Sequence, residues 1–485
     1  MISDAEFRAW LLADDKRRCV LAEVEAYSGG AVVTRYLSNL GYTSGPADTP
    51  ANTPYDEILL SVPSFASRMS DALQGYSQLA FGDLNISNAG GDLDGWLLDA
   101  WDGRPVRLYL GDPAWPRADF RLVFFGAAED ILASGNSMLT LKLRDRQVLL
   151  AVPMLTTLVG GAGPAKDRRR PACYGQCRHV SPVLIDAATR TYAVHDGPIQ
   201  AVDQVYEDGV PVAYTANLAA GEFSLTAALT GQITADVHGS KTGGVYVDRT
   251  ADIARRIVLE RTGLADIDAA SVAQLNSDQP AAVGLYVSGD AITVIGALDT
   301  LMTGAGAFYT VNRAGQLTMG QFNEPAGPPV LTLQDEDLAY GQTALQRRIL
   351  PLRSVRVGYA RNFTTVYSPA ASLTEAQRQR LADEFLVAKA TNTITGNLLA
   401  VDGDLARSCF ADEADAAAEA SRRAALWGQL RRIFRLPGFL AAQQLQLGDV
   451  IELELGRYGL SGVLATVVGL RESLTGGRVE LEVFL

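Results

Sequence analysis

Two parts of the chain, 345 residues apart, repeat the same pattern of strand and turn. Residues 103–111 read GRPVRLYLG and residues 448–456 read GDVIELELG, so in both a Gly precedes an aliphatic-x-Leu-x-Leu strand that a second Gly closes. Two further blocks follow in the same order: FGAAEDI (125–131) aligns with VGLRESL (468–474), and LTLKL (139–143) aligns with VELEV (479–483). The offset falls to 343 and then to 340, as expected when loops change length while strands keep their alternation. Any two antiparallel meanders share some of this pattern, but the conserved order predicts two copies of one β-domain.

The segment around the first copy has the periodicity of a β-rich domain. A short amphipathic helix, AEFRAWLLADD, precedes RRCVLAEVEAY, in which apolar and polar residues alternate as in a half-buried strand. Residues 41–54 (GYTSGPADTPANTP) have the composition of a loop, and strand patterns then follow one another from Tyr55 to about Val152.

Other patterns separate the two copies. The Gly- and Pro-rich linker LVGGAGPAKDRRRP precedes a segment in which Asp208-Gly209 between apolar runs predicts a hairpin. TADIARRIVLERTG reads as a helix, with Thr250 as the N-cap and Gly263 as the C-cap. The last part contains the Ala-rich helix ADEADAAAEASRRAALWG, where acidic residues come early and Arg422 and Arg423 come late, an order that suits the helix dipole.

These patterns predict an α+β, β-rich multidomain protein with four parts. The predicted ranges are 1–160 for a first β-domain with an N-terminal helix, 168–240 for an inserted β-rich domain, 241–328 for an inserted α+β domain, and 329–485 for a second β-domain that carries the long Ala-rich helix. If the repeat is real, a chain with two copies can form a ring of six similar units from three subunits.

Charge and composition exclude several classes of function. The formal net charge of −13 makes a stable nucleic-acid binder unfavourable, because such a surface repels phosphates. No apolar run approaches the length of a membrane span, and MISDAEFRAWLLADDKRR lacks the apolar core of a signal peptide, so we expect a cytoplasmic site of synthesis. Four scattered cysteines do not make a disulfide framework.

Residues 171–182 (PACYGQCRHVSP) concentrate potential metal ligands: Cys173, Cys177 and His179. The Cys-x3-Cys spacing differs from the Cys-x2-Cys of zinc sites, and a fourth ligand would have to come from a remote residue. A disulfide is disfavoured by the reducing compartment. The favoured interpretation is a loop entering a strand with two buried cysteines, and metal binding stays a testable alternative.

No catalytic motif is recognisable, so we predict no catalytic, cofactor-binding or metal residue and no cofactor. The chain lacks a G-x-S-x-G elbow, an H-E-x-x-H helix and a Walker A loop. Glu23 and Glu25 lie on one face of a predicted strand, about 7 Å apart, and are the best pair for a glycosidase. Any solvated strand face has such a pair, so a cell-wall-degrading enzyme (glycosidase or peptidase) is the alternative function, not the favoured one.

Several stretches together resemble the tail-tip or baseplate hub proteins of long non-contractile-tailed bacteriophages (siphophages). They are RCVLAEVEAY with TRYLSNLGYTS and DTPANTPYDEIL, then RPACYGQCRHVSPVLIDAATRTYAVHDGPIQAVDQVYEDGV, ALDTLMTGAGAFYTVNRAGQLTMGQF, VGYARNFTTV, and LQLGDVIELEL. The resemblance is piecewise over most of the chain, and its specificity comes from the order of the pieces.

The resemblance implies a non-enzymatic virion protein at the tail tip, assembled in the host cytoplasm. In such hubs three copies close the tail tube, and two tube-like β-domains per subunit continue the sixfold tube. The implied partners are the distal tail protein, the tape-measure protein and a central fibre or other tail-tip proteins, with phage DNA passing through transiently. The iron–sulfur cluster of some related hubs is not implied, because Cys19 and Cys409 are remote in sequence from Cys173 and Cys177. We also expect edge strands within 103–143 and 448–483 to form the ring contacts.

Overall fold

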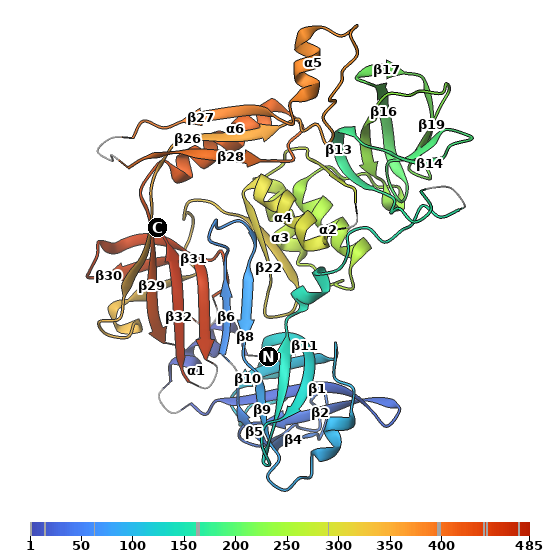
Figure 1. Cartoon of the computed structure of the whole chain (residues 1–485). Helices are drawn as coiled ribbons and strands as arrows, with labels where there is room; N and C mark the ends of the chain where they lie inside the picture. The colour runs from blue at the N-terminus through green and yellow to red at the C-terminus, as the bar shows by residue number, and fades with distance from the viewer. Residues whose placement is uncertain are drawn as a thin grey trace.

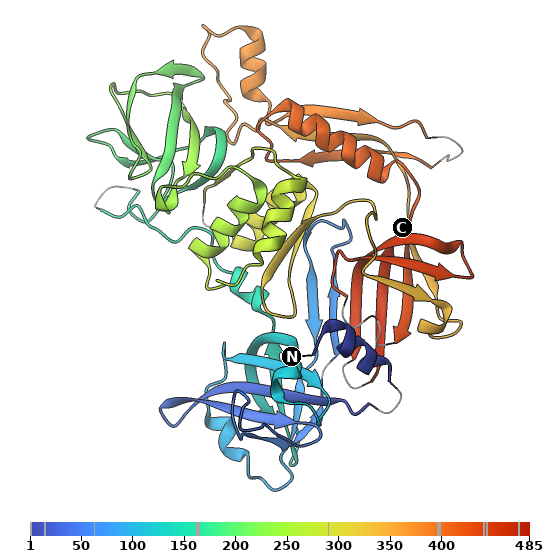
Figure 2. The same ribbon diagram turned by 180° about the vertical axis from the view of Figure 1, so that it is seen from behind.

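The computed structural model describes residues 2–13, 16–62, 64–161, 165–289, 291–394, 399–439, 442, 445–473 and 476–485. It is a β-rich α+β protein with several separate sheets, as predicted (Figures 1 and 2). None of its described helices is long and apolar enough to cross a membrane.

The first β-domain is built on a nine-stranded sheet in the order β3-β4-β2-β1-β10-β11-β12-β9-β5. Helix α1 (Asp4–Leu12) buries Phe7 and Leu11 and begins at a capping box in which Ser3 and Glu6 bond each other's backbone N–H groups. The strands are β1 (Cys19–Ser28), β2 (Ala31–Ser38), β3 (Tyr42–Thr43), β4 (Pro54–Glu57), β5 (Leu59–Ser61), β9 (Leu84–Ser87), β10 (Pro105–Gly111), β11 (Arg121–Ala133) and β12 (Met138–Arg144).

The second β-domain has the sheet order β24-β30-β31-β32-β29-β25, and its last strand ends one residue before the C-terminal Leu485. Its own strands are β24 (Leu331–Gln334), β25 (Ala344–Ile349), β29 (Arg431–Phe439), β30 (Val450–Leu455), β31 (Leu460–Ser473) and β32 (Arg478–Phe484). Two strands from the first part of the chain, β6 (Ser64–Arg68) and β8 (Gln78–Phe81), extend this sheet beside β31 (Figure 1).

Equivalent strands of the two β-domains pair in the same register. A bulge follows Leu108 in the β10–β11 ladder and Leu453 in the β30–β31 ladder, and a second bulge follows Ala128 in β11 and Val467 in β31. Every ladder pair of β10, β11 and β12 maps onto a pair of β30, β31 and β32 with offsets of 345, 339 and 340. Two bulges at the same ladder steps are specific features of a sheet, so they support a duplicated domain.

The ladders correct one block of the sequence alignment. The offset of 343 for FGAAEDI was wrong by four residues. The ladders show that FGAAEDI is equivalent to LATVVGL (464–470), at an offset of 339. Both choices keep the inside–outside alternation, since they differ by an even number of residues, and only the cross-strand partners distinguish them.

Two inserted parts lie between the β-domains. The first contains the sheets β17-β16-β20-β13-β21 and β14-β15-β19-β18, with β13 (Ala172–Val180), β14 (Val183–Asp186), β15 (Thr191–Ala193), β16 (Ile199–Glu207), β17 (Val210–Val212), β18 (Tyr214–Asn217), β19 (Glu222–Leu225), β20 (Ile233–Ser240) and β21 (Gly284–Val287). The second packs α2 (Thr250–Arg261), α3 (Ala269–Asp278) and α4 (Val294–Ala305) near β22 (Ala307–Val311) and β23 (Leu317–Gln321).

Another sheet, β27-β26-β28, lies between β25 and β29 in the chain. It packs against the part that contains α2, α3 and α4 (the helical part), not into the second β-domain. Its elements are β26 (Leu352–Tyr359), α5 (Glu375–Ala382), β27 (Leu386–Thr391), β28 (Val401–Arg407) and α6 (Glu413–Trp427). The predicted range 329–485 is therefore divided between two sheets. The predicted caps of α2 also differ: Arg249 and Thr262 occupy the cap positions.

The repeat predicts that two buried leucines at equivalent positions of the two β-domains contribute equally to the free energy of unfolding. Leu108 and Leu453 are both fully buried, so Leu108→Ala and Leu453→Ala should each lower the free energy of unfolding by about 2–5 kcal/mol, measured by denaturant titration. Leu132→Ala is the control, since that side chain is 41% exposed and should change stability by less than about 1 kcal/mol. A leucine truncated without loss in one domain would contradict the equivalence.

Candidate functional site

The candidate functional site is the set of junctions where the parts of the chain meet. The segment β6–β8 leaves the first β-domain between β5 and β9 and pairs with β31 of the second, from Ser64 opposite Ser473 to Arg68 opposite Gly469. Within this segment β7 (Gly75–Tyr76) pairs in parallel with β22 of the helical part. This hairpin is continuous with the first β-domain along the chain, and its backbone ladders join it to the second β-domain and to an inserted domain (Figure 1).

A buried ion pair lies beside this hairpin. Glu472 of β31 is only 3% exposed, and Arg313, in the turn between β22 and β23, donates from Nη2 to Glu472 Oε2 at 2.9 Å and to the Leu445 carbonyl at 3.2 Å. Burial raises the pKa of Glu472, and the Arg313 guanidinium opposes that rise. The pair therefore ties the helical part to the second β-domain in a place with little water.

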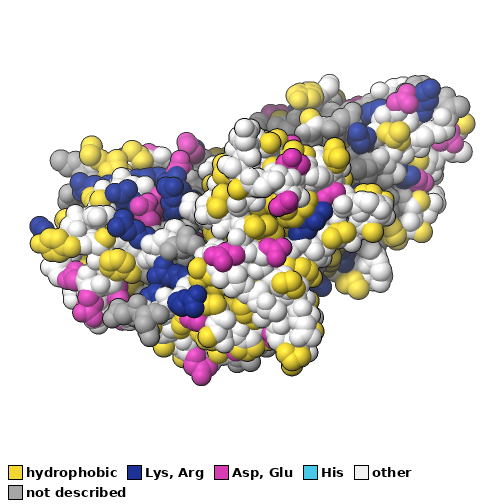
Figure 3. Space-filling view, turned by 90° about the horizontal axis from the view of Figure 1, so that it is seen from below, with side chains coloured by type: hydrophobic (Ala, Val, Ile, Leu, Met, Phe, Trp, Pro, Cys, Tyr) yellow, Lys and Arg dark blue, Asp and Glu magenta, His cyan; other side chains and the backbone are white. Residues whose placement is uncertain are grey.

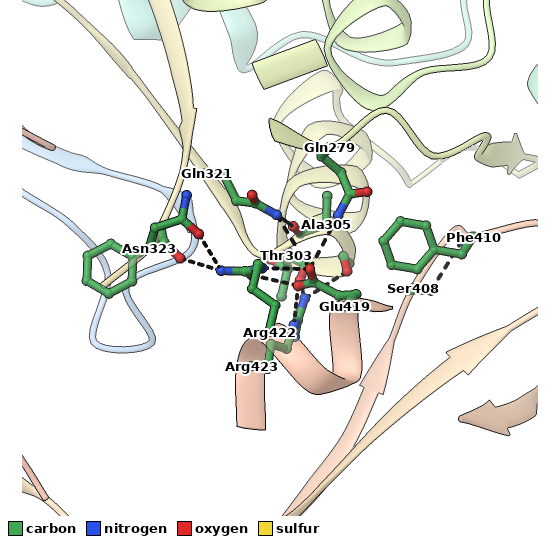
Figure 4. A network of polar contacts seen from close by, with 12 residues as sticks. Gln279, Thr303, Ala305, Gln321, Asn323, Ser408, Phe410, Glu419, Arg422 and Arg423 are labelled. Atoms are coloured by element: carbon green, nitrogen blue, oxygen red, sulfur yellow. Dashed lines mark hydrogen bonds and ion pairs between the residues drawn. The ribbon is translucent and has the colours of Figure 1, made fainter. Parts of the chain in front are cut away.

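A second polar network joins α6 to the end of α4 (Figure 4). Glu419 is 2% exposed and accepts from Arg423 Nε at 2.6 Å and from Arg422 Nη2 at 2.7 Å. Arg423 Nη2 then donates to the carbonyls of Thr303 and Gly304 at 2.8 Å each. These carbonyls belong to the last turn of α4, where backbone acceptors lack helical partners, so Arg423 caps a helix that is remote in sequence.

A third network joins the two inserted parts. The guanidinium of Arg261, at the end of α2, binds the Asp196 carboxylate, with Nη2 to Oδ1 at 2.7 Å, and donates to the hydroxyl of Tyr174. His195 Nδ1 accepts the backbone N–H of Cys173 at 3.0 Å, and burial lowers the pKa of His195 to about 4. His195 is thus neutral at pH 7 and acts as a hydrogen-bond acceptor.

The structure separates the three potential ligands of PACYGQCRHVSP. Cys173 and Cys177 lie in the core of the inserted β-domain, where Cys177 Sγ donates to the Tyr174 carbonyl at 3.4 Å. His179 instead lies against the Tyr206 ring, and its backbone N–H donates to Asp236. Among the described residues no group of three or more His, Cys, Asp or Glu side chains could hold a metal ion. The stretch forms strand β13 from Ala172 onward, where a loop entering a strand was expected, and both cysteines are buried as predicted.

Glu23 and Glu25 are both engaged by arginines. Glu23 accepts from Arg117 Nη2 at 2.7 Å and from the Tyr55 hydroxyl at 2.6 Å, and Glu25 faces Arg107 at 3.5 Å. Arg117 is buried, so Glu23 neutralises a charge that would otherwise be unpaired. This pair has a structural explanation that needs no catalysis.

The expectation that edge strands within 103–143 and 448–483 form ring contacts stays a prediction, and the strands of these two ranges lie mostly inside their sheets. Strands β10, β11 and β12 lie inside the first sheet, and β30, β31 and β32 lie inside the second. Each of them pairs with a neighbour on both sides along at least part of its length, because β1, β9, β24 and β29 flank the two meanders.

No sequence motif marks the junction residues Glu419, Arg423, Arg313 and Glu472. The helix spacing of Glu419 and Arg423, four residues apart, indicates an ion pair along α6, but nothing local indicates that both side chains are buried. Arg422 and Arg423 were explained by the dipole of their own helix, whereas Arg423 caps α4.

Comparisons with known proteins find matches among solved structures of tail proteins. No protein-family model and no curated protein matches the chain. Similar solved structures include the tail protein from Neisseria meningitidis MC58 (TM-score 0.42, 12% identity, 96% of each chain) and the prophage MuSo2 43 kDa tail protein from Shewanella oneidensis (TM-score 0.42, 11% identity, 96% of this chain and 98% of that one). A third is the prophage tail protein gp18 from Listeria monocytogenes EGD-e (TM-score 0.36, 6% identity, 87% of each chain).

All three are named tail proteins. This is the class of protein that the sequence resembles. Identities this low and TM-scores below 0.5 do not assign a function, so the function proposed below rests on the chain's own residues.

Removing the charge of Glu419 should release α6 from α4. Glu419→Gln leaves the buried Arg423 guanidinium without its carboxylate, so we expect the free energy of unfolding to fall by about 3–5 kcal/mol in denaturant titration. Asp404→Asn is the matched control, because Asp404 is exposed on β28. Equal stabilities of the two variants would contradict a buried network that fastens α6.

His195 should make the stability depend on pH. Its folded pKa of about 4 lies below the ordinary value of 6.5, so the unfolded chain takes up the proton first as the pH falls. The free energy of unfolding should therefore decrease from pH 7 to pH 5 by about 2 kcal/mol because of this group. His195→Asn keeps an acceptor near Nδ1 but does not titrate, so denaturant titrations should show a loss about 2 kcal/mol smaller. Equal losses would contradict the assignment.

Proposed function

We propose that the chain is a structural protein of a bacteriophage virion, a homotrimeric hub that closes the tail tube at the baseplate or tail tip. The observation that carries this proposal is the duplicated β-domain: two sheets with the same bulges and register, with β6, which lies between β5 and β9 in the chain, added to the second sheet beside β31. Three such chains supply six related units, which matches the resemblance in sequence to hubs that continue a sixfold tube.

The surface of the first β-domain supports burial in an assembly. Figure 3 views the molecule from below, with apolar and acidic side chains intermixed on the near surface. Large apolar side chains that are 38–90% exposed on this domain are Tyr27, Val32, Val33, Leu60, Leu97, Leu98 and Leu132. These exposed apolar side chains are available to contact another chain.

The proposed partners follow from the position of a hub. The ring would bind the distal tail protein on one side and a central fibre or other tail-tip proteins on the other, and the tape-measure protein would end inside it. The net charge of −13 supports a channel through which DNA slides without binding stably. We assign no enzymatic activity, because Glu23 and Glu25 are held by arginines.

Symmetry in the native particle tests the proposal. Cryo-electron microscopy of tails should show threefold density at the tip into which three copies of the chain fit, and mass photometry of the purified protein should detect a species of three times 51.8 kDa. Peptidoglycan zymography is the control for the alternative function. Density of other symmetry at the position of this chain, or a cleared zone that Glu23→Gln abolishes, would contradict the hub.

A further inference from the structure

The repeat shows one difference between the two β-domains in how a strand is paired. In the second β-domain, residues 469–473 of β31 have a ladder partner on both sides, β32 on one and β6 on the other. The equivalent residues of the first β-domain, at an offset of 339, are 130–133 at the end of β11 and Ser134 just after it. Among the described residues, β12 is the one ladder partner of 130–133. An edge that the chain covers in one copy is thus open in the other.

The backbone groups at this edge point outward. The Ser134 N–H donates to the Met138 carbonyl at 2.8 Å, so residues 132 and 134 face β12 and, by alternation, Ile131 and Ala133 face away from it. The N–H of Ile131 donates to Asp130 Oδ1 at 2.8 Å, a side-chain substitute for a strand partner. Its counterpart Leu470 lies opposite Ser67 of β6.

The side chains at this edge of the first β-domain are also more exposed to solvent than their counterparts in the second. Ala133 is exposed, whereas its counterpart Glu472 lies opposite Phe65 of β6 and is 3% exposed. Leu132 is 41% exposed. A strand added beside residues 130–134 would therefore cover the same kind of surface that β6 covers on β31.

We infer that residues 130–134, at the end of β11 and just after it, are the pairing edge for strand β28 of a second copy of this chain. The inference rests on the proposed function, since it names the contact that continues the ring from one subunit to the next. Within one chain, the segment inserted between β5 and β9 supplies the strand that pairs with the second β-domain. The equivalent segment of the second β-domain, acting in the same way, pairs with the first β-domain of another copy, so the occupant is a second copy of this chain. Pairing of this kind adds backbone hydrogen bonds between subunits.

The position of the donor segment follows from the repeat. Hairpin β6–β8 lies between β5 and β9 in the chain, and the corresponding place in the second β-domain, between β25 and β29, holds the sheet β27-β26-β28. Its outer strands β27 and β28 each pair with β26 alone, so each has one side open to a further strand.

Charge distinguishes β28 from β27. On β31 the added strand β6 places Arg68 at 2.8 Å from Glu482 of the neighbouring strand. The counterpart of Glu482 in the first β-domain, at an offset of 340, is Lys142, so the charge at this position is reversed. Strand β28 contains Asp402, Asp404 and, at its end, Arg407, which pairs with Glu384, whereas β27 contains Lys389 and no acid. An acidic strand complements Lys142.

A proline at the outward-facing position tests the edge. Ala133→Pro removes an N–H that faces away from β12, while Ala133→Ser keeps it and is the matched control. We expect the proline variant to need at least about a tenfold higher concentration to form trimers in mass photometry, the ratio that about 1.4 kcal/mol produces. Equal thermal unfolding of the two variants shows that the monomer fold is intact. Trimers of Ala133→Pro at the wild-type concentration would overturn the inference while leaving the proposed hub standing.

A charge exchange tests the strand. Lys142→Glu should weaken trimer formation, and adding Asp404→Lys in the same chain should restore it, whereas adding Lys389→Glu should not. Stronger trimer formation by Lys142→Glu alone, as expected if Lys389 of β27 faced this position, would overturn β28 in favour of β27. A wild-type chain that stays monomeric at every concentration, with no threefold density at the tail tip, would overturn both the edge contact and the proposed function.

Discussion

The pairing of β6 with β31 is the interaction on which the arrangement of the parts depends. Backbone hydrogen bonds between strands are directional and repeat along the ladder, so five consecutive pairs from Ser64 to Arg68 set both the distance and the angle between two domains. The same hairpin pairs through β7 with β22, which places the helical part in the same frame. A duplicated domain thus becomes an ordered unit because one copy supplies a strand to the other.

Buried ion pairs complete this frame at places where side chains from distant segments meet. Glu472 with Arg313, Glu419 with Arg423 and Asp196 with Arg261 each join two parts of the chain. Such pairs cost desolvation energy and are tolerated only when both partners and their hydrogen bonds are in place. A misplaced domain leaves a charge buried without its partner, so these ion pairs favour the correct arrangement of the domains.

The sequence allowed much of the fold to be predicted, and the errors have physical causes. Alternation and turn residues indicated the β-rich architecture, and ordered Gly-flanked strands indicated the repeat. The middle block was displaced by four residues because an even shift preserves alternation, and only the partner strand defines register. The strands to which ring contacts were assigned lie mostly inside their sheets, because a clear alternation is typical of strands that are paired on both sides.

The sequence by itself determined the class of structure, the duplication of a β-domain and the absence of a recognisable catalytic motif, because periodicity, turn chemistry and motif spacing are local properties. Tertiary structure alone decided that Cys173 and Cys177 are core residues separated from His179, that Arg423 caps α4, and that β6 leaves its own domain to pair with β31. These outcomes depend on which distant segments approach one another. Hydrogen bonds and burial reward such contacts only after the chain has folded, so no local pattern records them.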